Sequence, residues 1–180
     1  MKHFGVLARF IYEGGIKVAD KYAGLTYEQV VNKFFQTIAS VCVLHIKNYA
    51  DAQDCFQNTF VKLFEKSPTF NDEEHLKAWL IRVAINECNN LYRKNKRLVS
   101  FDDYKKEKSI KYISDDEKDI SWALIQLDEK YRDVLYLRYC ENYNANEIAK
   151  ILSKNPATVR TMLKRGKEML KRIYGGDDDE

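Results

Sequence analysis

The chain has 180 residues, of which 45% are apolar and 32% are charged. This composition is typical of a soluble globular protein, and the length suits one mid-sized domain or two small ones. Only seven Gly and two Pro are present, which argues against a turn-rich β architecture and favours an α-rich fold. The net charge is +3, too small by itself to indicate a nucleic-acid partner, so the distribution of charge must decide.

The cysteines and the two ends of the chain bear on its location. The four cysteines lie far apart and form no CxxC pair, which favours buried, reduced thiols over disulfides or zinc ligation; they are Cys42, Cys55, Cys88 and Cys140. A cytoplasmic location follows. No apolar run approaches the roughly 20 residues that cross a bilayer, so no membrane insertion is expected. Residues 1–26 are interpreted as an N-terminal extension of unknown role, and residues 175–180 as a solvated acidic tail.

Two amphipathic helices are predicted in the first half of the chain. From Tyr27 to about Tyr49, apolar residues recur at helical spacing, namely Phe34, Ile38, Val41 and Leu44. A second helix is expected near Asp51, whose carboxylate can cap the first turn. Its inward stripe contains Cys55, Phe56, Thr59, Phe60, Leu63 and Phe64. Its opposite face carries Asp54, Gln57, Asn58 and Lys62.

A break and a third helix follow. Pro68 lacks an N–H and disfavours helical angles at Ser67, so a loop is predicted there. Helical periodicity resumes after Asn71 or Asp72, and the inward positions are Leu76, Trp79, Leu80, Val83 and Leu91. The polar side of this helix carries, on one shared face, Asn86, Asn90, Arg93 and Arg97.

The middle of the chain separates two units. Residues 98–119 mix acids with lysines and have few periodic apolar residues, which is typical of a mobile linker. A second domain is expected near Ile120, beginning with a short helix through Trp122, Leu124 and Leu127. Asp128 is expected to cap the next helix, and Asn142 to adopt the left-handed angle that closes it.

The pattern after Asn144 indicates a helix-turn-helix. Asn144 and Glu147 have the spacing of a reciprocal capping box, the helix stops near Ser153, and Asn155 followed by Pro156 predicts an immediate restart. On the restarted helix, one face is apolar and another stacks the basic residues Arg160, Lys164, Lys167 and Lys171. Like charges stacked on one helix face repel one another. Binding of a polyanion to that face offsets the repulsion, as when such a helix enters the major groove of DNA.

With both halves in view, the chain resembles the bacterial sigma factors of the extracytoplasmic-function (ECF) group. Three stretches carry the resemblance: "DAQDCFQNTFVKLFE" is similar to the family's polymerase-docking helix, "LKAWLIRVAINECNNLYRKNKR" to its promoter-melting helix pair, and the helix-turn-helix to its fourth domain. The fold implied is all-α, with two small helical domains joined by a flexible linker, the second a helix-turn-helix. Sigma domain 2 would occupy residues 27–97 and sigma domain 4 residues 120–174.

The resemblance also implies partners and site residues. Core RNA polymerase would contact Asp51, Asp54, Gln57 and Asn58. Unpaired promoter DNA at the minus-ten element would meet Asn86, Asn90, Arg93, Lys94 and Arg97, with a flipped base held by the loop Ser67 to His75. Duplex DNA at the minus-thirty-five element would meet Arg160, Thr161, Lys164 and Arg165. An anti-sigma protein is a further expected partner, and no cofactor is.

This sequence departs from the family at three places. The family often has an acid at Asn58, and Ser153 and Lys154 replace its usual turn Gly and Ile. These departures bear on the strength of the polymerase contact and on the geometry of the turn.

Other classes of function fit less well. No phosphate-cradling Gly-rich loop, HExxH motif or nucleophile elbow occurs, so no enzyme is expected. Helix capping explains the carboxylates of Asp51 and Asp54 better than metal binding does, and His3, His45 and His75 are isolated in the sequence. The main alternative is a stand-alone helix-turn-helix regulator that binds duplex DNA without polymerase. A helical interaction module with no DNA role is a third.

Overall fold

The computed structural model describes residues 22–46, 48–66, 68–98 and 123–174. These residues form helices and no strand beyond an isolated bridge between Tyr22 and Leu25. The helices are α2 (Tyr27–His45), α3 (Tyr49–Lys66), α4 (Glu73–Leu98), α6 (Glu129–Tyr139), α7 (Ala145–Leu152) and α8 (Pro156–Tyr174). The predicted all-α class is confirmed, whereas the expected linker and acidic tail lie outside the described residues.

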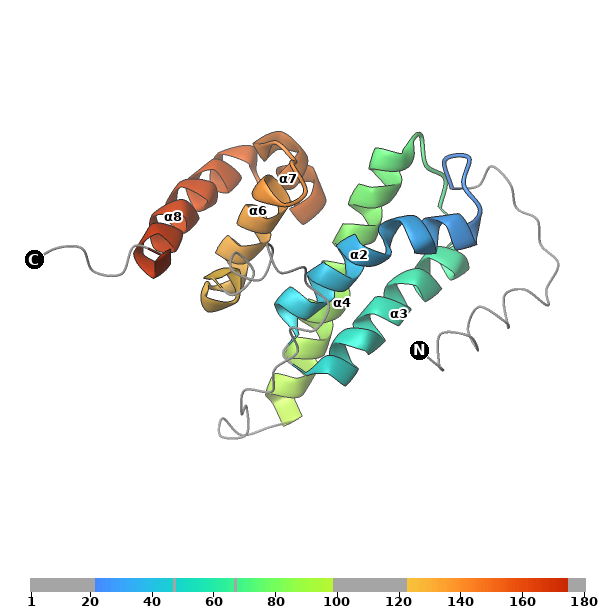
Figure 1. Cartoon of the computed structure of the whole chain (residues 1–180), viewed down its shortest axis with the longest axis horizontal. Coiled ribbons are helices and arrows are strands. Elements are labelled where there is room, and N and C mark those ends of the chain that lie inside the picture. Colours follow the sequence, from blue (N-terminus) through green and yellow to red (C-terminus); the bar gives the residue numbers. More distant parts are fainter. Residues whose placement is uncertain (1–21, 47, 67, 99–122, 175–180) are drawn as a thin grey trace, which may run out of the picture.

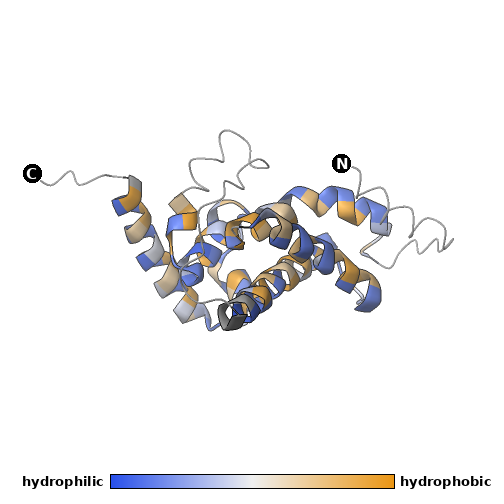
Figure 2. Cartoon of the chain, turned by 90° about the horizontal axis from the view of Figure 1, so that it is seen from below, coloured by the Kyte–Doolittle hydropathy of each residue, from blue (hydrophilic) through white to orange (hydrophobic). Residues whose placement is uncertain are grey.

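The first three helices pack on one another as a bundle, and α6, α7 and α8 form a second group beside it (Figure 1). Their apolar faces turn toward each other and their polar faces outward, as the helical spacing predicts (Figure 2). Thr26 caps α2 through a reciprocal capping box with Gln29, and Tyr22 is buried against the bundle. The last residues of the expected N-terminal extension therefore belong to the packed fold.

Most of the predicted core positions of the first bundle are buried. They include Phe34, Ile38, Val41, Leu44, Phe60, Leu63, Leu76 and Leu80. Phe64 was predicted to face inward, and this is wrong: its side chain is 49% exposed, and its ring makes a T-shaped contact with Tyr27. The predicted cap of α3 is also wrong, because Asn48, not Asp51, accepts hydrogen bonds from the N–H groups of Ala50 and Asp51. Asp51 is the third residue of the helix and lies in its first turn.

Three of the four cysteines meet inside this bundle. Cys42, Cys55 and Cys88 are buried, and Cys140 is exposed. Hydrogen bonding between the thiols, together with burial, raises the pKa of Cys55 and of Cys88. Cys55 and Cys88 are therefore protonated thiols, and all three cysteines are free and buried, as the sequence predicts.

The two groups of helices share one continuous core. Buried side chains connect the bundle of α2, α3 and α4 to Leu124, Leu127 and the apolar faces of α6 and α7. Residues 123–126 are helical, in agreement with the predicted short helix, although Trp122 lies outside the described residues. Asp128 occupies the N-cap of α6, but its side chain accepts no capping hydrogen bond, contrary to the prediction. None of the described helices is long and apolar enough to span a bilayer.

Candidate nucleic-acid interface

The first candidate surface lies on α4. Asp72 accepts a hydrogen bond from the His75 N–H at 2.7 Å and so starts the helix just after the predicted loop. Four of the five residues predicted to meet unpaired DNA have exposed side chains, namely Asn86, Asn90, Arg93 and Lys94. Arg97 lies on the same helix, but its side chain is outside the described residues.

The segment expected to form a helix pair is a single helix. α4 runs without interruption from Glu73 to Leu98, because no Pro or Gly interrupts it and Leu76, Leu80, Ala84 and Cys88 anchor one continuous buried stripe. The continuous helix that the periodicity predicted is confirmed, and the helix pair that the resemblance implied is not found. A single helix keeps Asn86 and Arg93, two turns apart, on one rigid face.

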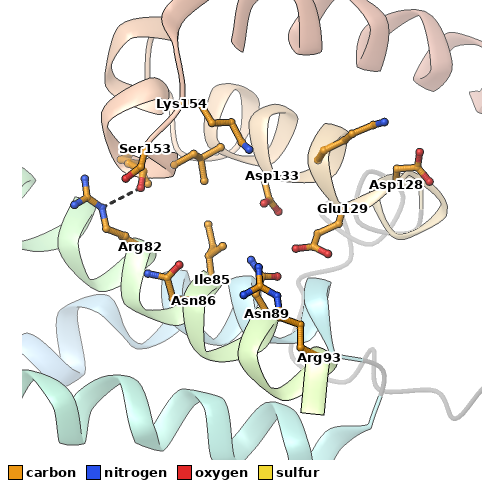
Figure 3. Close-up of a pocket in the computed structure, with 13 residues that line it drawn as sticks. Arg82, Ile85, Asn86, Asn89, Arg93, Asp128, Glu129, Asp133, Ser153 and Lys154 are labelled. Atoms are coloured by element: carbon orange, nitrogen blue, oxygen red, sulfur yellow. Dashed lines mark hydrogen bonds between the residues drawn. The ribbon is translucent and has the colours of Figure 1, made fainter. Parts of the chain in front are cut away.

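An open cleft of about 560 Å³ lies along this face of α4. Its α4 wall carries Arg82, Ile85, Asn86, Asn89 and Arg93 (Figure 3). Asn90 and Lys94 lie outside the cleft lining, whereas Arg82 and Asn89 belong to it although the sequence did not suggest them. The signal that was missed is spacing: Arg82 precedes Asn86 by four residues and Asn89 follows it by three, which places all three side chains on the same helical face.

The opposite wall of the cleft comes from the second group of helices. It carries the acids Asp128, Glu129 and Asp133 at the start of α6, together with Lys130, Ile151, Leu152, Ser153 and Lys154. The Glu129 carboxylate points toward Asn89 and Arg93 (Figure 3). The cleft is therefore basic and amide-rich on one side, whereas the other side carries three acids and two lysines.

The loop before α4 is partly packed. Phe70 makes edge contacts with the rings of His75 and Trp79, at centroid distances of 5.5 and 5.8 Å. Thr69 and Asn71 are exposed beside it. Residue 67 lies outside the described part, so the loop expected over Ser67 to His75 is seen as residues 68–72 followed by the first turn of α4.

The helix-turn-helix has the predicted local chemistry. Asn144 accepts hydrogen bonds from the N–H groups of Asn146 and Glu147, and the Glu147 carboxylate accepts one from the Asn144 N–H at 2.7 Å. Ser153 adopts the left-handed conformation at φ 52°, so Ser performs the turn that Gly usually makes. Asn155 then accepts from the Ala157 N–H at 2.8 Å and starts α8 with Pro156 as its first residue.

The second helix of this motif, α8, exposes the predicted basic stripe. The side chains of Arg160, Lys164, Arg165, Lys167 and Lys171 are all exposed, while Val159 and Gly166 are buried against α6 and α7. Arg160 donates to Asn146 on α7 at 3.2 Å, which steadies its guanidinium at the surface. The Thr161 hydroxyl donates to the Ala157 carbonyl at 3.0 Å.

The third candidate surface is the outer face of α3. Asp54 and Asn58 are exposed, and Asp51 and Gln57 are half-buried. The four predicted polymerase-contacting residues therefore share one accessible side of a helix, with Asp51 in its first turn, where a carboxylate is favoured by the helix dipole.

Comparison of the sequence and the fold with known proteins identifies the family to which the chain is related. The sequence matches sigma-70 region 2 over residues 30–98 and sigma-70 region 4 over residues 119–170. The RNA polymerase sigma factor SigV of Bacillus subtilis is 30% identical over 129 residues, covering 71% of this chain and 78% of SigV. The ECF sigma factor SigW of the same organism is 24% identical over 163 residues, covering 81% and 87% of the two chains.

The chain belongs to the ECF group of bacterial sigma factors. The sigma factor RpoE of Bartonella quintana, solved in complex with the anti-sigma factor NepR, has the same fold: the TM-score is 0.70 at 22% identity, covering 84% of this chain and 98% of RpoE. This ECF sigma factor is thus an alternative sigma factor that directs transcription initiation. A stand-alone regulator would account for region 4 but would leave region 2 without a role.

Proposed function

We propose that this sigma factor binds core RNA polymerase and engages a promoter through two surfaces, unpaired DNA on α4 and duplex DNA on α8. One observation carries the proposal: a single chain with sigma regions 2 and 4 exposes Asn86 and Arg93 on one helix and Arg160 and Arg165 on another. The assignment of individual residues to promoter contacts forms part of the proposal.

The α4 face suits a single strand of DNA. Asn side chains offer both a donor and an acceptor to the edge of an unpaired base, and Arg and Lys hold the phosphates. Flipping bases out of the duplex costs a few kcal/mol, which contacts from Asn86, Asn90, Arg93 and Lys94 would offset. The neighbouring loop, at Thr69 and Asn71, would receive an extruded base.

The α8 face suits the major groove. Arg160, Thr161, Lys164 and Arg165 lie within the first ten residues of the helix, the part that reaches base edges in a helix-turn-helix. An Arg can bind O6 and N7 of guanine bidentately, and a Lys neutralises phosphate. We assign base reading to Arg160 and Arg165, with Lys164 close to the backbone.

The polymerase contact is assigned to the exposed side of α3. Asp51, Asp54, Gln57 and Asn58 form a polar, acid-containing face that fits a basic docking surface on the enzyme. The protein itself would carry out no catalytic step and would act in the cytoplasm, where its polymerase works. Because RpoE was solved with an anti-sigma factor, we also propose an inhibitory protein partner for this chain.

The test is run-off transcription with purified core polymerase on a promoter library. We expect transcripts only when this chain is added. Replacing both Asn86 and Arg93 with Ala should abolish initiation while polymerase binding persists, whereas replacing Asp54 and Asn58 should weaken polymerase binding. Chain-dependent DNA retention without transcription or polymerase binding would instead support the stand-alone regulator.

A further inference from the structure

A side-chain hydrogen bond links the two helices of the helix-turn-helix at its exposed surface. The helices α7 and α8 pack against each other in the second group of helices (Figure 1). Nη2 of Arg160, in the second turn of α8, lies 3.2 Å from Oδ1 of Asn146, in the first turn of α7. Both side chains are exposed, so the bond lies on the side of the motif that DNA can reach.

The chemistry of the two groups determines what this bond leaves available. A guanidinium only donates hydrogen bonds, so the atom of Asn146 that faces Arg160 must be the amide oxygen. The bond uses one of the five N–H donors of a guanidinium and leaves four. A bidentate contact with O6 and N7 of guanine needs two donors. Arg160 can therefore keep its bond to Asn146 while it binds a guanine.

The side chain of Asn146 takes no part in capping α7. The cap is Asn144, whose Oδ1 accepts hydrogen bonds from the backbone N–H groups of Asn146 and Glu147 at 2.9 and 3.1 Å. The Glu147 carboxylate accepts from the Asn144 N–H and completes the capping box. Replacing Asn146 with Ala therefore leaves every bond of the cap in place, and Ala is itself a favourable helix residue.

The bond distinguishes Arg160 from its basic neighbours. Lys164 and Arg165 are exposed on the same helix, and neither side chain has a hydrogen-bond partner among the described residues. A long side chain loses rotamer freedom when it binds its target, and this loss weakens affinity roughly 2–10-fold for each immobilised side chain. Because Asn146 already restricts the guanidinium of Arg160, part of this loss is incurred before DNA arrives.

We propose that Asn146 is a positioning residue for base recognition, which holds the Arg160 guanidinium in the orientation that binds guanine in the major groove. The effect depends on the DNA sequence. Without Asn146, Arg160 would lose its rotamer freedom only on DNA that has guanine at the contacted position, so binding to that DNA weakens and binding to other sequences hardly changes. A residue of α7 thus sets the selectivity of a residue of α8. This inference rests on the proposed function, which assigns base reading to Arg160.

The experiment measures base selectivity with the full chain bound to core RNA polymerase. A duplex library of random sequence is selected on the wild-type complex, and the enriched site is then varied one base pair at a time. Arg160→Ala identifies the base pair that Arg160 reads, because selectivity for guanine should fall there by roughly 5–150-fold. At the same base pair, Asn146→Ala should lower the selectivity roughly 2–10-fold, while affinity for the site without that guanine changes little.

Three companion variants separate positioning from a structural role. The carboxylate in Asn146→Asp still accepts from Arg160, so selectivity should be retained, although the added negative charge weakens binding to every sequence. In a protein that carries Arg160→Ala, the further substitution Asn146→Ala should not change selectivity, because Asn146 acts through Arg160. Asn32→Ala removes the same side chain from an exposed site on α2 and is the matched control, which should change neither affinity nor selectivity. Circular dichroism verifies that each variant is folded.

The outcomes separate this inference from the proposed function. If Arg160→Ala lowers selectivity but Asn146→Ala leaves it unchanged, or weakens binding to all sequences equally, the positioning role is overturned and the base-reading assignment stands. Loss of selectivity in Asn146→Asp, or a further loss in the double variant, also overturns the positioning role. The proposed function fails differently: the wild-type complex enriches no site, or Arg160→Ala leaves selectivity unchanged at every base pair, and either result contradicts both proposals.

Discussion

Substituting Gly166 with Ala should destabilise the protein, although Ala normally stabilises a helix. Gly166 lies in the middle of α8, where replacing Gly with Ala gains about 1 kcal/mol in an exposed helix. A Cβ at this position would lie 2.9 Å from Cδ1 and 3.1 Å from Cγ of Leu135, and 3.4 Å from Cβ of Tyr131. Leu135 is fully buried, so it has no open space to move into. Overpacking of this kind costs about 1–3 kcal/mol.

The overpacking cost exceeds the helical gain, so we expect the free energy of unfolding to fall by about 1 kcal/mol. Urea unfolding followed by circular dichroism measures this as a lower midpoint with an unchanged slope. Glu168→Ala, at an exposed site two residues away, is the control and should stay within about 0.5 kcal/mol of wild type. In a protein that carries Leu135→Val, which removes the nearest atom, the further substitution Gly166→Ala should cost less free energy of unfolding than it does in the wild type. An increase of about 1 kcal/mol in the stability of Gly166→Ala would refute the claim that α6 and α8 touch at this glycine.

Three further predictions concern the turn, the DNA contacts and the buried ion pair. Ser153→Gly should raise the free energy of unfolding by about 0.5–1 kcal/mol in urea titrations, because Ser153 adopts a left-handed conformation that Gly tolerates without strain. On duplex DNA, Arg165→Ala should cost about 1–3 kcal/mol and relax selectivity at one base pair, whereas Lys164→Gln should lower the slope of log affinity against log salt by about 1. Burial lowers the pKa of His45, but the Asp133 carboxylate, whose Oδ1 lies 2.6 Å from Nε2 of His45, raises it, and the net pKa lies above the ordinary value of about 6.5. The stabilisation from this buried pair is therefore fully present below the ordinary pKa and is lost as pH rises through the raised value, so the free energy of unfolding in urea should fall over that range.

Each of these has a matched control or an outcome that would contradict it. Lys154→Gly changes the neighbouring residue, which has no positive φ, and should lower stability rather than raise it. Equal losses on every DNA sequence for Arg165→Ala would contradict base reading by that residue. In His45→Gln the free energy of unfolding should no longer show this pH dependence, and a wild-type free energy of unfolding that rises with pH through this range would overturn the assigned charge state.

Local chemistry determined which parts of the fold were predictable. The helix-turn-helix follows from Asn144, Glu147, Asn155 and Pro156, whose effects reach no further than four residues, so the sequence alone specifies it. The same reasoning gave the wrong cap for α3. Asn48 and Asp51 are both good capping residues, and where the chain enters the helix determines which of them accepts the hydrogen bonds.

Long-range contacts were not predictable. His45 and Asp133 are 88 residues apart, and nothing in the sequence near either residue indicates the other. His45 was accordingly described as isolated, whereas it contacts Asp133 in the core. The cleft follows from the same packing: helical spacing placed Asn86 and Arg93 on one face of α4, but the acids facing them come from the second group of helices, far away in the sequence.

Promoter opening by core polymerase is the most direct test of the two-surface account. Permanganate reacts with unpaired thymines, so it maps the melted segment on a promoter incubated with core polymerase and this chain. The account predicts reactive thymines from the minus-ten element to the start site only when the chain is present, and their loss when Asn86 and Arg93 are both replaced with Ala although the variant still binds polymerase. Melting that persists in the double variant would contradict the assignment of unpaired DNA to α4.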